Sequence, residues 1–250
     1  MRIVIELMSK DKVVLPVGFN RYIQALIYNL IDMADSNWLH NTGYKMENKS
    51  FKLFTFSSIL EMGRYIKEER LFIFPNKISF TVSSPVDWIL EEVAKNTITN
   101  DSLQLGNNYL SVLSINVLKQ PVFKSNKIKI RAVTPIEVHS TFQKSNGKKI
   151  THYYTPFEDE FNSMINFNLR DKRKALFNDN FESDITIKPL FKGNNYERIV
   201  YFGTGENKTI VKGWKGYFEL NGDIKLLDFA YNTGLGSRNS QGFGMIEVVE

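Results

Sequence analysis

Apolar residues recur at helical spacing over the stretch from Asn20 to Ala34. Separations of three, four, seven and eight positions place them on one face of a helix. Asn20, which follows Pro16 and Gly18, is a favourable N-cap residue. The pattern predicts one amphipathic helix whose buried face carries Ile23, Leu26, Ile27, Leu30 and Ile31.

Shorter apolar or alternating stretches predict strands on both sides of that helix. Ser84-Pro85-Val86-Asp87 has the hydroxyl, the proline and the early acid of a helix start. The expected order in the first half is therefore strand, helix, strand, strand, helix, strand, which is the ferredoxin-like unit. Right-handed crossovers place both helices on one face of a four-stranded antiparallel sheet and leave the other face open. The predicted strands are residues 1–7, 51–56, 77–82 and 109–118.

The second half repeats this scheme less regularly. Ser145-Asn146-Gly147 predicts a hairpin that pairs residues 137–142 with 149–154. Thr155-Pro156-Phe157-Glu158 has the form of a capping box with Pro at the first helical position, and the helix that it opens is expected to end near Phe177. Further strands are expected at 127–133, 185–190, 198–202, 210–220 and 243–249, with a short helix beginning at Gly222-Asp223.

These elements predict an α+β protein made of two tandem ferredoxin-like (RRM-like) domains. The first is expected to span residues 1–118 and the second residues 119–250, joined near Lys119-Gln120-Pro121. The second domain would carry a basic hairpin and a glycine-rich loop close to the C-terminus.

Composition narrows the class of protein. The chain has 250 residues, of which 42% are hydrophobic and 24% are charged, a mixture typical of globular proteins. Because no run of about eighteen apolar residues occurs, we expect no membrane-spanning helix and a cytoplasmic protein. The sequence has no Cys, which removes disulfides and thiolate metal sites, and His40, His139 and His152 are far apart. No metal or other cofactor is therefore expected.

Basic residues are concentrated between Lys119 and His152, where Glu137 is the only acid. The net charge of +5 is mild, but clustered cations attract polyanions and release counterions on binding. A solvated hairpin explains the same cluster, so charge alone leaves both interpretations open. The cluster consists of Lys119, Lys124, Lys127, Lys129, Arg131, Lys144, Lys148 and Lys149.

Residues 234–244 read Gly-Leu-Gly-Ser-Arg-Asn-Ser-Gln-Gly-Phe-Gly, with four glycines in eleven positions. Glycines permit positive φ and close backbone approach, and successive N–H groups can face phosphate oxygens. Arg238 and Ser240 would add a charged fork and a hydroxyl. A tight turn without a ligand is the alternative. The Gly-Lys-Ser/Thr ending of a Walker loop is missing, and a strand is expected after the loop, unlike in a dinucleotide fingerprint.

This loop resembles the glycine-rich signature of the RAMP superfamily of CRISPR proteins, which begins Gly-hydrophobic-Gly and ends Gly-Phe-Gly. Within the superfamily the chain resembles the Cas6 family of endoribonucleases, which process CRISPR repeat transcripts. Two further segments agree with that family. They are Leu26-Ile27-Tyr28-Asn29 in the first helix, and Trp38-Leu39-His40 followed by the strand that starts Phe51-Lys52. The resemblance therefore extends from the first strand to the last.

The resemblance implies RNA cleavage without a metal, in which a 2′-hydroxyl attacks the adjacent phosphorus and a 2′,3′-cyclic phosphate forms. Such a reaction needs a base, an acid and a cation that offsets charge on the phosphorane oxygens. By this resemblance Tyr28, His40 and Lys52 are the candidate catalytic residues. The candidate RNA-binding residues are Lys127, Lys129, Arg131, Lys148, Lys149, Gly234, Gly236, Arg238, Ser240, Gly242 and Gly244.

Each catalytic candidate also has a structural interpretation. His40 is expected in an exposed loop, where its imidazole suits either proton transfer, and base and acid stay open. Tyr28 lies at the edge of the apolar stripe, and its usual pKa of about 10 favours a positioning role over that of a base. Lys52 is expected to point outward from a strand, as an ordinary surface lysine does. Lys45 and Lys49 are its possible substitutes.

Two other hypotheses are kept. A non-catalytic RAMP subunit would hold RNA inside a CRISPR interference complex and would not need the catalytic set. An unrelated RNA-recognition module would show a Lys/Arg-Gly-Phe-like motif, which the sequence lacks. His139 and His152 are expected to be structural or incidental. The expected partners are CRISPR repeat RNA and, in the first alternative, interference-complex subunits, while the oligomeric state stays open.

Overall fold

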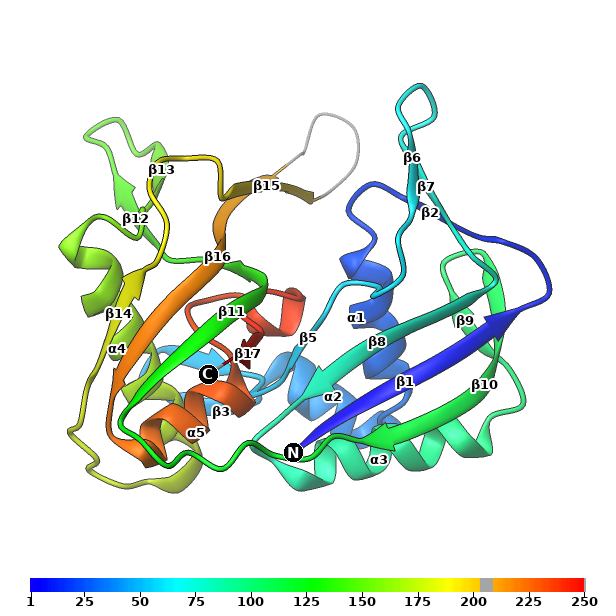
Figure 1. The fold of residues 1–250 in the computed structure, drawn as a ribbon, viewed down its shortest axis with the longest axis horizontal. Coiled ribbons are helices and arrows are strands. Elements are labelled where there is room, and N and C mark those ends of the chain that lie inside the picture. Colours follow the sequence, from blue (N-terminus) through cyan, green and yellow to red (C-terminus); the bar gives the residue numbers. More distant parts are fainter. Residues whose placement is uncertain (203–208, 250) are drawn as a thin grey trace.

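The computed structural model describes residues 1–202 and 209–249. Figure 1 shows two halves that lie side by side, each with its own antiparallel sheet. Each sheet has a separate apolar core, formed by residues 3–110 in one half and by residues 128–246 in the other. The division into domains 1–118 and 119–250 stays a proposal. Within the described ranges, no helix is both long and apolar enough to cross a membrane.

The N-terminal sheet has the strand order β5-β8-β1-β10-β9. Its central strand β1 pairs antiparallel with both neighbours, so that Ile3 faces Val82 on one side and Val117 on the other. Ile3, Ile5 and Leu7 alternate into the core, as a half-buried strand requires. The strands are β1 (Arg2–Ser9), β5 (Thr55–Phe56), β8 (Lys77–Ser83), β9 (Leu103–Leu105) and β10 (Asn108–Val117).

The single helix predicted over residues 20–34 is wrong, because the structure has two helices, α1 (Asn20–Asn29) and α2 (Met33–Asn41). The side-chain amide of Asn96 donates to the Leu30 carbonyl at 3.0 Å and to the Asp32 carboxylate at 3.1 Å, which holds the chain at the break. Local periodicity cannot reveal this contact, because Asn96 belongs to α3 (Asp87–Thr99). As a consequence, His40 lies on a helix and not in the loop that we expected.

The strand predicted over residues 51–56 is also wrong in part. It divides into β4 (Lys49–Phe51), which pairs with β3 (Tyr44–Met46), and the short β5. Between them Leu53 has a φ of 53°, and its carbonyl accepts a hydrogen bond of 2.8 Å from the Ser84 hydroxyl. This bend places Lys52 outside any strand, so the expected in-and-out alternation does not apply to it.

Two other differences are a small sheet that was not predicted and a helix that begins later than predicted. The sequence patterns missed a small sheet of β2 (Val13–Pro16), β7 (Leu71–Phe74) and β6 (Arg64–Ile66), whose strands have only three or four residues. Helix α3 begins at Asp87, after the proline that we expected in its first turn. The Ser84 hydroxyl accepts a hydrogen bond from the Val86 N–H at 3.0 Å and does not cap the first turn of α3.

The C-terminal sheet has the order β14-β16-β11-β17, with β15 paired to the other end of β16. Its four main strands repeat the arrangement of the first sheet, so the fold is a tandem pair of ferredoxin-like units, as predicted. The strands are β11 (Lys127–Ile136), β14 (Ile185–Pro189), β15 (Glu197–Phe202), β16 (Thr209–Gly222) and β17 (Ile246–Val248).

The remaining elements surround this second sheet. The predicted hairpin is confirmed as β12 (His139–Gln143) and β13 (Lys149–Tyr153). Helix α4 (Asp159–Phe177) begins three residues later than the expected Pro156, although the Glu158 carboxylate accepts the Thr155 N–H. Helix α5 (Ile224–Thr233) and the short helix η1 (Asn239–Gln241) precede the last strand, β17.

Arg2 joins the two halves. Its side chain is 3% exposed, and its guanidinium lies 3.4 Å from the centroid of the Tyr231 ring. The same group donates to the Ser83 hydroxyl at 3.1 Å and to the Tyr231 carbonyl oxygen. Burial lowers the pKa of Arg2 to about 10, and the Tyr231 contacts offset part of that effect. The first strand is thereby held against α5 of the other half.

We expect Arg2→Met to lower the free energy of unfolding by about 2–4 kcal/mol, because the Tyr231 carbonyl and the Ser83 hydroxyl lose a buried donor. Chemical denaturation followed by fluorescence measures this change. Arg170→Met, which removes a partly exposed ion pair with Asp184 at 3.2 Å, serves as the matched control and should cost about 1 kcal/mol or less. Equal losses for the two variants would contradict the assigned role of Arg2.

Candidate functional site

The structure brings two of the candidate catalytic side chains into contact. The rings of Tyr28 on α1 and His40 on α2 pack edge to face, with centroids 5.2 Å apart. The Ser36 hydroxyl donates to the Tyr28 carbonyl at 2.9 Å and fixes one helix against the other. Both rings line a cavity of about 310 Å³, together with Arg21, Gln24, Ala25, Asn29, Ser36 and Asn37. We call this space the Tyr28 cavity.

His40 is exposed in the last turn of α2. Its Nδ1 lies 3.0 Å from Oδ1 of Asn41, an acceptor, so the Nδ1 proton is donated to that amide. In the neutral imidazole the other nitrogen, Nε2, is then the acceptor. This tautomer can take a proton from a substrate hydroxyl at Nε2.

Tyr28 is only 9% exposed, and its ring also packs edge to face on Phe54, with centroids 5.6 Å apart. Burial raises the pKa of the Tyr28 phenol to about 12. The phenol therefore stays protonated near neutral pH and can act as a hydrogen-bond donor. This geometry fits a positioning group better than a base.

Lys52 is half-buried and lies beside the turn that follows α2. A Cβ atom at Gly43 would be 3.1 Å from Lys52 Nζ, which shows how closely the ammonium approaches that turn. Nζ donates to the Ser50 hydroxyl at 3.0 Å, and burial lowers the pKa of Lys52. Lys52 therefore adjoins the turn that follows α2, at Gly43, while Phe54, two residues further along, contacts Tyr28.

Lys52 lines a second, larger cavity of about 580 Å³ between the two halves. One wall is formed by residues 49–54, and the other by α4, the start of β12 and the glycine-rich loop. We call it the basic cavity, because the charged and polar side chains that line it include Lys49, Lys52, His139, Lys172, Arg238 and Ser240. Lys49, the possible substitute for Lys52, is paired with Asp171 at 2.5 Å.

The glycine-rich loop packs its backbone against neighbouring backbone. A Cβ atom at Gly236 would overlap the carbonyl oxygen of Glu137, and one at Gly244 would overlap that of Leu235. Both glycines also have positive φ, 69° and 72°. Close approach to protein backbone thus explains these two glycines. At Gly234 and Gly242 the space for a Cβ atom is taken by the side chains of Asn239 and Phe56.

The N–H groups of this loop mostly bond to protein carbonyls, and this restricts the phosphate-cradle hypothesis. Internal acceptors take the N–H groups of Gly234, Leu235, Ser237, Gln241, Gly242 and Gly244. The loop therefore presents side chains to the basic cavity, chiefly Ser237, Arg238 and Ser240. Of the predicted loop residues, the cavity lining contains Gly236, Arg238 and Ser240.

Lys172 holds this loop from beneath and escaped the sequence analysis. It is 3% exposed, and its Nζ donates to the carbonyls of Gly234 and Gly236, each at 3.0 Å, and to Oδ1 of Asn239 at 2.6 Å. Burial lowers the pKa of Lys172 to about 7, whereas three acceptors favour the charged form. Its position seven residues after Ile165 on the buried stripe of α4 was the available signal.

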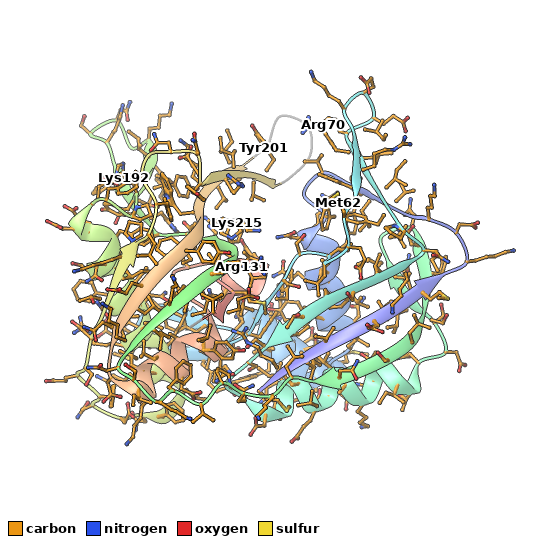
Figure 2. The ribbon with its side chains drawn as sticks, viewed as in Figure 1. Met62, Arg70, Arg131, Lys192, Tyr201 and Lys215 are labelled. Atoms are coloured by element: carbon orange, nitrogen blue, oxygen red, sulfur yellow. The ribbon has the colours of Figure 1, made fainter. Side chains whose placement is uncertain are left out.

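The other predicted RNA-binding residues lie away from both cavities. Lys127 and Arg131 pair with Glu219 at 2.9 Å and Glu247 at 2.5 Å on the sheet face opposite the core, a face that Lys129 shares. Figure 2 labels Arg131 and Lys215 on this face. Burial lowers the pKa of Lys215, with smaller effects of Arg198 and Arg131 in the same direction. Lys148 and Lys149 are exposed near the turn of the hairpin.

Comparison with known proteins identifies the family. The family model described as "CRISPR associated protein Cas6, C-terminal" matches residues 118–248. The model described as "CRISPR-associated protein Cas6, N-terminal" matches residues 14–116. The chain belongs to the Cas6 family. The resemblance found in the sequence is thereby confirmed.

Several Cas6 relatives match over nearly their whole length. CRISPR-associated endoribonuclease Cas6 1 of Methanocaldococcus jannaschii is 29% identical over 257 aligned residues, which cover 100% of this chain and 93% of the relative. CRISPR-associated endoribonuclease Cas6 of Pyrococcus furiosus is 29% identical, with coverage of 99% and 90%. A solved structure described as CRISPR associated protein Cas6 has a TM-score of 0.76 at 26% identity, and covers 100% of this chain and 99% of that one.

Among the residues that the structure describes in this Cas6 chain, no three His, Asp or Glu side chains are grouped as ligands for a metal ion. Glu158, Asp159 and Glu160 lie at the start of α4, and Glu158 is engaged with Thr155 and with His152 at 3.2 Å. Whether the protein works without a metal stays a prediction, which an assay in chelator can test.

We expect Lys172→Met to loosen the glycine-rich loop, because three acceptors lose their donor. Hydrogen–deuterium exchange should then rise at least tenfold for the amides of residues 234–244, while α5 exchanges as in the wild type. Lys174→Met, on the exposed side of the same helix, is the matched control and should leave the loop unchanged. Unchanged loop exchange in a folded Lys172→Met protein would contradict the assignment.

Proposed function

We propose that this Cas6 chain is an endoribonuclease that cuts precursor CRISPR RNA within its repeats, without a metal, by attack of a 2′-hydroxyl. The products are a 2′,3′-cyclic phosphate and a 5′-hydroxyl. The observation that supports this most is the Tyr28–His40 ring pair at 5.2 Å, in a chain whose relatives are named endoribonucleases. A subunit that only holds RNA does not need an exposed imidazole oriented in this way.

His40 is proposed as the general base. Its Nδ1 is engaged with Asn41 at 3.0 Å, which leaves Nε2 to accept the proton of the attacking 2′-hydroxyl. The new O2′–P bond forms as the P–O5′ bond breaks, and O5′ leaves as a hydroxyl with a proton taken from water. Positioned proton transfers of this kind typically contribute about 10²- to 10⁴-fold to the rate.

Tyr28 and Lys52 are proposed to act on the phosphate itself. The phenol of Tyr28, held protonated by burial, would donate to an oxygen of the reacting ribose or phosphate. The Lys52 ammonium would offset the negative charge that grows on the non-bridging oxygens. Lys52 lies where the segment 49–54 borders the basic cavity, so the cut would fall between that cavity and the Tyr28 cavity.

The remaining RNA is proposed to follow the basic residues of the C-terminal half. Arg238 and Ser240 of the loop would contact the chain next to the cut. Lys127, Lys129, Arg131, Lys148 and Lys149 would add phosphate contacts further away, which weaken as salt rises. A non-catalytic RAMP subunit of an interference complex is the alternative, and the cleavage assay below separates the two.

We expect the wild-type protein to cut CRISPR repeat RNA in EDTA and to leave a 2′,3′-cyclic phosphate. A 2′-deoxy substitution at the cut site should abolish cleavage, since the nucleophile is removed. His40→Ala should lower the single-turnover rate about 10²- to 10⁴-fold while RNA affinity changes less than threefold. Mass spectrometry of the products and filter binding measure these quantities. Cutting of the 2′-deoxy RNA would exclude the proposed nucleophile.

A sulfur atom in place of the bridging 5′-oxygen distinguishes a base from an acid, because a thiolate leaves without a proton. If His40 is the base, the rate defect of His40→Ala should persist on this 5′-phosphorothiolate RNA. Recovery of the rate to within tenfold of the wild type would instead assign His40 as the acid. Single-turnover cleavage of the two RNAs by wild type and variant makes the comparison.

A further inference from the structure

Glu137 carries a carboxylate that is buried completely beside the basic cavity, with 0% of its side chain exposed. It lies between β11 and β12, where its carbonyl oxygen accepts the Ser237 N–H at 2.8 Å. An isolated β-bridge also joins it to Gly236. The backbone of Glu137 therefore supports the glycine-rich loop at Gly236 and Ser237.

An imidazole and a guanidinium flank this carboxylate. Nδ1 of His139 lies 2.5 Å from Oε1 of Glu137, and Nε of Arg238 lies 3.8 Å from Oε2. Burying a carboxylate is costly unless it is paired, and these two contacts supply the pairing of Glu137. The pairing is incomplete, because buried Oε2 of Glu137 and Nε of Arg238 have no hydrogen-bond partner in the described structure.

The carboxylate points inward, whereas its partners reach the cavity. The side chains of His139 and Arg238 are 24% and 28% exposed, and both line the basic cavity with Lys52. Arg238 is steadied by Gln241, whose Oε1 accepts from Nη1 at 3.3 Å. The ring of Tyr153 packs against His139 with centroids 5.8 Å apart.

The hydrogen bond to Glu137 fixes the orientation of the imidazole. With Nδ1 bound to the carboxylate, Nε2 is on the opposite side of the ring. Within residues 1–202 and 209–249, no protein hydrogen bond to this Nε2 is found. When the ring carries both protons, Nε2 can donate a hydrogen bond to an anion while Nδ1 stays on the carboxylate.

We propose that His139 and Arg238, held by Glu137, form a subsite for an RNA phosphate next to the scissile one. This inference rests on the proposed function and makes Glu137 a positioning residue and His139 a substrate-binding residue. A phosphodiester fits because the His139 imidazole and the Arg238 guanidinium fork line a cavity that also presents Ser237, Ser240 and Lys52. The expectation that His139 is structural or incidental is replaced by this role.

The same hairpin contains a matched control. His152 and Glu158 form a second His–Glu pair at 3.2 Å, but their side chains are 49% and 35% exposed and line neither the basic cavity nor the Tyr28 cavity. His152→Gln therefore removes the same kind of pair without touching the subsite.

The test measures the affinity of the full-length protein for uncleavable repeat RNA, 2′-deoxy at the cut, with a single neutral methylphosphonate placed at each linkage around the cut. We expect one methylphosphonate adjacent to the scissile linkage to weaken wild-type binding about tenfold or more. His139→Gln should bind the unmodified RNA about tenfold more weakly, and the same methylphosphonate should then cost less than twofold. His152→Gln should match the wild type throughout.

Glu137→Gln keeps the shape of the side chain and should produce the same pattern as His139→Gln, with a raised KM and a kcat within about threefold of the wild type. A wild-type protein that neither binds nor cuts repeat RNA would overturn the proposed function and this subsite with it. If the wild type cuts normally but each methylphosphonate weakens RNA binding by His139→Gln as much as it weakens binding by the wild type, only the subsite is overturned. An even loss of affinity at all linkages, as misfolding would give, also counts against it.

Discussion

The close packing of the glycine-rich loop against both halves is the constraint on which the site depends. Gly236 touches the Glu137 carbonyl in the C-terminal half, and Gly242 lies against Phe56 and Asn20 of the N-terminal half. The Thr55 hydroxyl donates to the Phe243 carbonyl at 2.9 Å across the same junction. A side chain at Gly236 would overlap the Glu137 carbonyl, which as backbone cannot yield as a flexible side chain does. A side chain at Gly242 would press on the Phe56 ring and the Asn20 amide and would push the halves apart.

Polar atoms buried by that packing need partners, and Lys172 supplies them from α4. The loop is thus ordered from within, and its own N–H groups are largely used by the protein. What remains for a ligand are side chains, with Arg238 and Ser240 facing Lys52 from the other half across the basic cavity. The proposed reaction accordingly needs both ferredoxin-like units, although the imidazole and the phenol come from only one of them.

Sequence periodicity predicted the two ferredoxin-like units, since alternating strands such as β1 and amphipathic helices bury faces that their own residues define. It failed where distant side chains decide the course of the chain, as Asn96 does at the break after Leu30 and Ser84 does at Leu53. For this reason His40 was placed in a loop and Lys52 on a strand.

The candidate site was predictable only in part, and for a similar reason. Tyr28 and His40 came from the family resemblance, but their ring contact depends on the angle between two helices. Glu137 and His139 are only two positions apart in the sequence, but their pairing matters because the Glu137 carboxylate is buried. The sequence showed a single acid among basic residues and gave no sign that this acid is buried. The helical spacing places Lys172 on the buried stripe of α4, but the loop carbonyls that it binds belong to a segment more than sixty residues away.

A structure of the protein bound to repeat RNA with a 2′-deoxy cut site tests the central claim most directly, namely that RNA is cut between the Tyr28 cavity and the basic cavity. We expect the scissile phosphate within hydrogen-bond distance of Lys52 Nζ, the C2′ atom that carries the attacking hydroxyl in unmodified RNA near His40 Nε2, and the neighbouring nucleotide in the basic cavity. RNA bound only across the outer face of the C-terminal sheet, with the cut linkage far from His40, would contradict it.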